Sequence, residues 1–117
     1  MKDLLTVAKS RHLLTSKQIS ALELTKEILR CIHATEDKVA SYVTITEELA
    51  LQQADEADKC IQKGQMHSLT GIPMQIKDNL STANVLTTCS SNMLRNYIPP
   101  FNATVVEKLR KEKTILL

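Results

Sequence analysis

Apolar residues recur at helical spacing in three stretches of the first half of the chain. The stretches are residues 3–9, residues 20–33 and the segment that follows Thr46, and each places its apolar residues on one side of a helix. Ser20 and Glu23 are spaced as in a capping box, so we expect the second helix to begin at Ser20. The first half of the chain is therefore predicted to be helical.

The third predicted helix carries a stripe of small apolar residues. Ala50, Ala54 and Ala57 lie on one face together with Ile61, and Gly64 is suited to the left-handed turn that ends a helix. Small side chains let another element approach closely. We expect this stripe to pack within the chain, although a partner helix could also dock on it.

The pattern changes in the second half. Residues 72–77 alternate between apolar and polar, which predicts a strand with its aliphatic residues on one face and Gln75 and Lys77 on the other. Asp78 and Asn79 are expected to end this strand. Asn84, which tolerates positive φ, is expected to hold a turn.

A further helix and strand are predicted near residue 117. Pro99 and Pro100 interrupt regular structure, and Asn102 is expected to cap a helix. The residues of that helix expected to face inward are Val105, Val106 and Leu109. Residues 115–117 are typical of the start of a buried strand.

Helices followed by strand, helix and strand indicate an α/β fold. Residues 1–65 form the helical segment, and residues 66–117 form the start of an α/β core. The last helix and strand are half of a crossover unit, and we expect an incomplete domain whose last strand lacks neighbours. The isolated chain is therefore expected to be only marginally folded.

Composition and charge exclude several classes of protein. Only 3% of the 117 residues are aromatic and the net charge is +2, which disfavours a single-stranded nucleic-acid platform. The basic residues at 108–113 alternate with Glu107 and Glu112, as on a solvated helix face. No stretch has the length of a membrane span or the form of a signal peptide.

The three cysteines do not form a recognisable ligand or disulfide set. Cys31, Cys60 and Cys89 are odd in number and lack CxxC spacing. We expect reduced thiols in a cytoplasmic protein, without a metal site.

Lys77 is the candidate chemical group. It follows an apolar run, and burial of a lysine favours the neutral amine that can act as a base. Composition and spacing alone favour a simpler interpretation, in which the side chain extends from a strand end into water.

The residues around Lys77 resemble the amidase signature family. The motif Gly-Ile-Pro-x-x-Ile-Lys-Asp-Asn occupies residues 71–79, and further similarity lies at residues 87–91, 93–94 and 99–106. The Thr-Thr-Cys and Pro-Pro segments are most similar to the A subunits of glutamyl-tRNA(Gln) amidotransferases. This resemblance covers nearly the whole chain and implies the mixed β-sheet of that family.

The resemblance implies that Lys77 is a catalytic base. In the family, this lysine works with two serines, one of them in a cis peptide bond, and the nucleophilic serine attacks a carboxamide. It also implies B and C partner subunits, with glutamine as substrate and tRNA contacted only through the complex. ATP and Mg²⁺ are used by the B subunit, and no cofactor or membrane is implied for this chain.

The resemblance places both serines beyond Leu117. Ser81, Ser90 and Ser91 are the nearest serines in this sequence, and the last two match a structural segment of the family. We therefore expect an inactive fragment that holds the base. A fragment of another amidase acting on a small amide, and a non-catalytic helical interaction module, are the alternatives.

Two positions depart from the family pattern. Asn84 and Lys113 stand where glycine is common. Asparagine is the least awkward replacement where φ is positive. Lysine in that conformation costs about 1 kcal/mol, so we expect the turn at Lys113, and with it the course of the last residues, to be remodelled.

Overall fold

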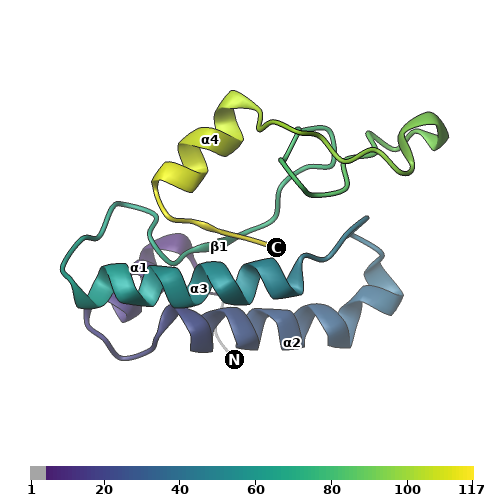
Figure 1. The fold of residues 1–117 in the computed structure, drawn as a ribbon. Helices are drawn as coiled ribbons and strands as arrows, with labels where there is room; N and C mark the ends of the chain where they lie inside the picture. Colours follow the sequence, from purple (N-terminus) through teal and green to yellow (C-terminus); the bar gives the residue numbers. More distant parts are fainter. Residues whose placement is uncertain (1–4) are drawn as a thin grey trace.

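The computed structural model describes residues 5–117, in which a pair of long helices supports a short parallel β-pair. In Figure 1, α2 and α3 run side by side in opposite directions beneath the strands, and α4 lies on the other side of them. This arrangement confirms the α/β class. The elements, in order, are α1 (Val7–Thr15), α2 (Ala21–Val39), α3 (Glu47–Gln62), β1 (Pro73–Met74), the 3₁₀ turn η1 (Asn92–Leu94), α4 (Thr104–Lys111) and β2 (Ile115–Leu116).

The start of α2 is fixed by two sets of side chains. The predicted capping box is present: the Ser20 hydroxyl accepts from the Glu23 N–H, and Glu23 accepts from the Ser20 N–H at 2.8 Å. Asp58 of α3 accepts from the N–H groups of Ala21 at 2.7 Å and Leu22 at 3.0 Å. The free N–H groups of α2 thus bind a carboxylate of the neighbouring helix.

Three predicted boundaries of the first two helices were wrong. The first helix was expected to end at residue 9, but α1 continues to Thr15. α1 begins at Val7, because the Thr6 hydroxyl accepts from the Lys9 N–H, and so caps the helix later than predicted. Residues 3 and 4 lie outside the described residues. α2 continues to Val39, six residues beyond the predicted end, because residues 34–39 contain no glycine or proline to stop it.

The alanine stripe of α3 is confirmed as an internal packing face. Ala50, Ala54 and Ala57 are fully buried in the same core as residues of α2 and β2. Small side chains here allow close approach of the neighbouring elements, and α3 contacts both α2 and β2. The stripe is therefore covered within the chain.

The last strand does not lack neighbours, contrary to the sequence-based expectation. β2 pairs in parallel with β1, with Pro73 opposite Ile115 and Met74 opposite Leu116. On the other edge, Gln53 accepts from the Leu116 N–H at 2.8 Å, and the Thr46 hydroxyl donates to the Leu116 carbonyl at 3.1 Å. Thr46, at the start of α3, and Gln53, within it, thus pair with the main-chain groups of Leu116 that a further strand would otherwise bind.

The strand ahead of Lys77 is shorter than predicted. Only Pro73 and Met74 pair as a strand, although burial still alternates, with Ile72 buried and Gln75 and Lys77 exposed. The backbone leaves the pairing at Gln75.

The start of α4 also differs from prediction. Ala103, and not Asn102, is the N-cap, because the Asn102 side chain accepts from the Ala83 N–H at 2.7 Å. Val106 is fully buried, but Val105 is exposed.

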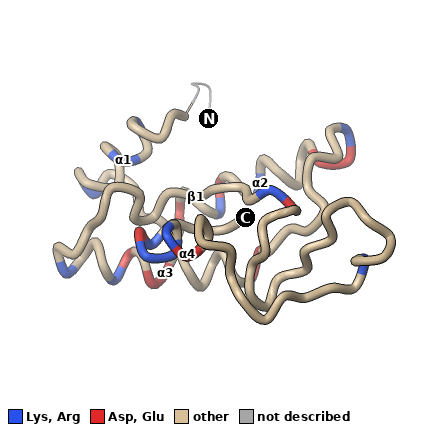
Figure 2. The backbone as a smooth tube through the Cα atoms, turned by 90° about the horizontal axis from the view of Figure 1, so that it is seen from above, with Lys and Arg blue, Asp and Glu red and all other residues tan. Residues whose placement is uncertain are grey.

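Residues 79–103 form an irregular loop that extends from the helical layers and carries a single charged residue, Arg95. Figure 2 shows charges of both signs on α2, α3 and α4, as expected for a solvated surface, whereas α1 carries basic residues only. Among the residues described, no helix is long and apolar enough to cross a membrane.

Asn84 has φ of 63°, as expected, but the remodelling expected at Lys113 does not occur, because Lys113 adopts the left-handed conformation with φ of 59°. Replacing Lys113 with glycine is expected to raise the free energy of unfolding by about 1 kcal/mol, because glycine adopts this conformation without steric cost. Denaturant unfolding measures the change. The matched substitution K108G, at an exposed lysine inside α4, is expected to lower stability by about 1 kcal/mol. Destabilisation by K113G would contradict this account.

Candidate functional site

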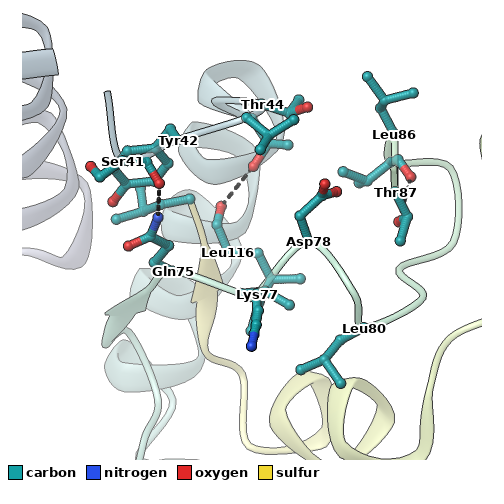
Figure 3. Close-up of a pocket in the computed structure, with 15 residues that line it drawn as sticks. Ser41, Tyr42, Thr44, Gln75, Lys77, Asp78, Leu80, Leu86, Thr87 and Leu116 are labelled. Carbon is teal, nitrogen blue, oxygen red and sulfur yellow. Dashed lines mark hydrogen bonds between the residues drawn. The ribbon is translucent and has the colours of Figure 1, made fainter. Parts of the chain in front are cut away.

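A pocket of about 440 Å³ lies at the ends of the parallel strands. Figure 3 shows its walls, which come from the α2–α3 connection, the segment after β1 and the loop around residue 86. Together with Leu116 and Leu117, these segments bring residues 41–46, 75–87 and 116–117 together where β1 and β2 end. The lining residues are Ser41, Tyr42, Val43, Thr44, Thr46, Gln75, Ile76, Lys77, Asp78, Leu80, Val85, Leu86, Thr87, Leu116 and Leu117.

Lys77 lies in this pocket, three residues after the end of β1. Its side chain is exposed, so residues 5–117 do not provide the burial expected for a neutral amine. In Figure 3 the amine points away from Ser41, while the Gln75 amide points toward it and donates to the Ser41 carbonyl at 2.9 Å. The amine is therefore accessible to further groups.

The described part of the pocket contains one serine, Ser41. Its hydroxyl donates to Glu36 at 3.0 Å, and its carbonyl already accepts from Gln75. Ser90 and Ser91 lie outside the pocket lining, and Ser91 instead caps η1 by accepting from the Met93 N–H. Among residues 5–117, Ser41 is thus the only serine that lines the pocket with Lys77; Ser81, Ser90 and Ser91 do not line it.

Asp78 is a site residue that sequence reasoning treated only as a strand end. Its carboxylate accepts from the Thr88 N–H at 2.8 Å, from the Thr88 hydroxyl and, at 3.5 Å, from the Ser90 N–H. Its carbonyl accepts from the Cys89 N–H at 3.0 Å. The adjacency of Lys and Asp in the motif was the only sequence signal for this role.

The hydrogen bonds determine the ionisation of Asp78. Partial burial alone would raise the pKa of this carboxyl, but the donors on Thr88 and Ser90 outweigh it and lower the pKa. A lowered pKa means that these bonds stabilise the fold at neutral pH. That stabilisation is lost only as pH falls through the folded-state value, below the ordinary range for aspartate.

One polar atom in the wall has no hydrogen-bond partner among the described residues. The Thr44 hydroxyl oxygen is buried and unpaired, and Thr44 lines the pocket. Buried hydroxyl groups normally have a partner.

The described residues hold no group of three or more acidic, histidine or cysteine side chains close enough to bind a metal. Cys31, Cys60 and Cys89 are free thiols. Of the charged side chains that line the pocket, the Lys77 amine is accessible, whereas the Asp78 carboxylate is already bound to Thr88 and Ser90.

Comparison with known proteins identifies close relatives. The A subunit of the glutamyl-tRNA(Gln) amidotransferase of Thermoanaerobacter pseudethanolicus is 55% identical over 113 residues, which is 97% of this chain and 23% of that protein. The protein of the same description from Caldanaerobacter subterraneus subsp. tengcongensis is 52% identical over the same shares. The chain thus spans about a quarter of the length of these relatives.

Solved structures share the fold. The peptide amidase of Stenotrophomonas maltophilia superposes with a TM-score of 0.88 at 27% identity, over 95% of this chain and 23% of that one. An amidase family protein from Bacillus anthracis gives a TM-score of 0.82 at 28% identity, over 97% and 23%. The family model described as Amidase matches residues 23–117. The chain therefore belongs to the amidase signature family.

Proposed function

We propose that this chain is part of the amidase component of a glutamyl-tRNA(Gln) amidotransferase and supplies its catalytic base, Lys77. The observation that carries the proposal is the position of Lys77, on the family motif and in the pocket at the ends of β1 and β2. The 55% identity to a protein of that description, over nearly the whole chain, supports the choice of substrate.

In the proposed reaction, glutamine is hydrolysed to glutamate and ammonia. Uncharged Lys77 accepts a proton from a bridging serine, which in turn accepts one from a nucleophilic serine. The nucleophile attacks the glutamine carboxamide, the protonated relay returns a proton to the leaving nitrogen, and ammonia departs. Water then hydrolyses the acyl-enzyme. Both serines are proposed to come from residues outside these 117.

The proposal includes a complex in the cytoplasm. A B subunit would use ATP and Mg²⁺ to activate glutamyl-tRNA(Gln), and a small C subunit would hold the two larger subunits together. The tRNA would meet this chain only through the complex. The relatives' description as A subunits supports the existence of other subunits, and the three free thiols fit a reducing compartment.

The test is ammonia release by a full-length polypeptide that contains these residues. We expect hydrolysis of glutamine that rises when the B and C subunits are added, and no hydrolysis by residues 1–117 alone. Turnover of unrelated amides without any response to those subunits would refute the amidotransferase assignment.

An amidase that acts alone on a small amide is the second candidate. The structural match to a peptide amidase at 27% identity supports this candidate. Comparing hydrolysis of glutamine with that of unrelated amides, with and without the B and C subunits, separates the two candidates. A non-catalytic module that docks a partner helix on the alanine stripe is disfavoured, because Ala50, Ala54 and Ala57 are fully buried within the chain.

A further inference from the structure

We propose that Asp78 is a positioning residue of the Lys77 site. Its carboxylate accepts from the Thr88 and Ser90 N–H groups and its carbonyl accepts from the Cys89 N–H. Together these bonds fix the turn beside Lys77. This inference rests on the proposed function, which it deepens by assigning a second residue to the site.

Asp78 binds the turn through both its side chain and its main chain. One carboxylate oxygen accepts from the Thr88 N–H at 2.8 Å, and the other accepts from the Thr88 hydroxyl and the more distant Ser90 N–H. The Asp78 carbonyl accepts from the intervening Cys89 N–H at 3.0 Å. Three successive N–H groups are thus bound to oxygens of one residue.

The backbone of the turn requires such an anchor. Cys89 and Ser90 have φ of 51° and 54°, two consecutive non-glycine residues in the left-handed region. Such conformations persist only where surrounding contacts hold them, and they are frequent at functional sites. Successive N–H groups arranged this way form an anion-binding concavity. Here the Asp78 carboxylate binds the Thr88 N–H and, more distantly, the Ser90 N–H, which also donates to the Thr88 hydroxyl at 3.2 Å. The Asp78 carbonyl binds the Cys89 N–H.

The anchored turn is connected to the pocket on both sides. The Lys77 carbonyl accepts from the Leu80 N–H at 3.0 Å, which closes a tight turn containing Asp78. Thr87, directly before the anchored turn, lines the pocket together with Lys77 and donates its N–H to the Tyr97 carbonyl at 3.0 Å. Loss of the carboxylate would release this wall and the chain on which Lys77 is carried.

The experiment uses full-length polypeptide that contains these residues and measures kcat and KM for amide hydrolysis. D78A is expected to lower kcat about 10²-fold with little change in KM, because a small displacement of a catalytic group has an effect of this size. The D78N variant is expected to keep most of the wild-type kcat. Its amide oxygen still accepts from the Thr88 N–H, and its NH₂ can donate to the Thr88 hydroxyl.

Sodium formate provides a second readout, with sodium chloride at equal ionic strength as its control. The D78A substitution leaves the Thr88 and Ser90 N–H groups without their carboxylate, so formate is expected to bind there and raise kcat of D78A. It is not expected to raise kcat of K77A. The matched carboxylate removal D55A, at an exposed Asp55–Lys59 pair on α3, is expected to leave kcat unchanged.

The outcomes separate the two proposals. If K77A retains activity, the proposed function fails. The positioning role is overturned if K77A is inactive but D78A has normal kcat. It is also overturned if folded D78A gains no activity from formate and the D78N variant is as inactive as D78A. If D78A does not fold, T88V takes its place. T88V removes one donor and is expected to lower kcat about tenfold; unchanged kcat in T88V would overturn the inference.

Discussion

Replacing Lys77 with alanine in the full-length polypeptide is expected to lower kcat for amide hydrolysis by about 10² to 10⁴-fold, the range for loss of a general base. K77R is expected to be equally inactive, because the guanidinium keeps its proton at all accessible pH values. Neither substitution is expected to affect folding, because the Lys77 side chain is exposed in the pocket. Steady-state kinetics with circular dichroism of the same samples measure both effects.

The matched control is K63A, at the C-terminal end of α3 and outside the pocket lining. It removes an exposed lysine of the same kind and should leave kcat unchanged. Activity of K77A within a few-fold of the wild type would rule out the catalytic assignment. An equal loss of kcat in K63A would show that the effect comes from removing a positive charge and not from Lys77 itself.

Substituting Gly71 is expected to cause the largest loss of stability among the changes considered. A Cβ at this position would lie 3.1 Å from the Ala21 Cβ and 3.3 Å from a Leu14 methyl carbon, and φ is +77°. The left-handed conformation costs about 1 kcal/mol for a side chain, and overpacking a core costs about 1–3 kcal/mol. The free energy of unfolding of G71A should therefore fall by about 2–4 kcal/mol. If the isolated chain is only marginally folded, this change should unfold it.

Gly64 provides the control for the conformational part of this cost. It has a similar φ of +71°, but a Cβ there would meet no atom within 4 Å. G64A should therefore lower stability by only about 1 kcal/mol. Far-UV circular dichroism during urea unfolding compares the two variants. Equal losses would show that packing against Leu14 and Ala21 contributes nothing.

Several features of the fold could be predicted because they depend on residues close in sequence. The Ser20–Glu23 capping box, the buried alanine stripe of α3 and the positive φ of Asn84 follow from side-chain type at fixed spacing. The positive φ of Lys113 does not, because lysine disfavours that conformation. Helix ends were less predictable. No local signal stops α2 at residue 33, and only the structure shows it continuing to Val39.

The candidate site was only partly predictable. The motif identified Lys77, and the structure places it in a pocket, but its catalytic role stays a prediction. The anchoring of residues 88–90 by Asp78 was missed, because a partner ten residues away depends on the path of the loop. The prediction that Asn102 caps α4 was wrong for the same reason, because its side-chain oxygen accepts from the N–H of Ala83, nineteen residues earlier.

The sequence by itself determined the α/β order of elements, the inward face of α3 and the identity of the amine that follows β1. Periodicity and capping are local, so they report which face of an element is buried and where a helix begins. Only the tertiary structure decided what occupies the free main-chain groups. Thr46 and Gln53 bind the outer edge of β2, and Asp78 binds the turn at residues 88–90. Buried N–H and C=O groups must find partners, and which side chains reach them depends on how distant segments are packed together.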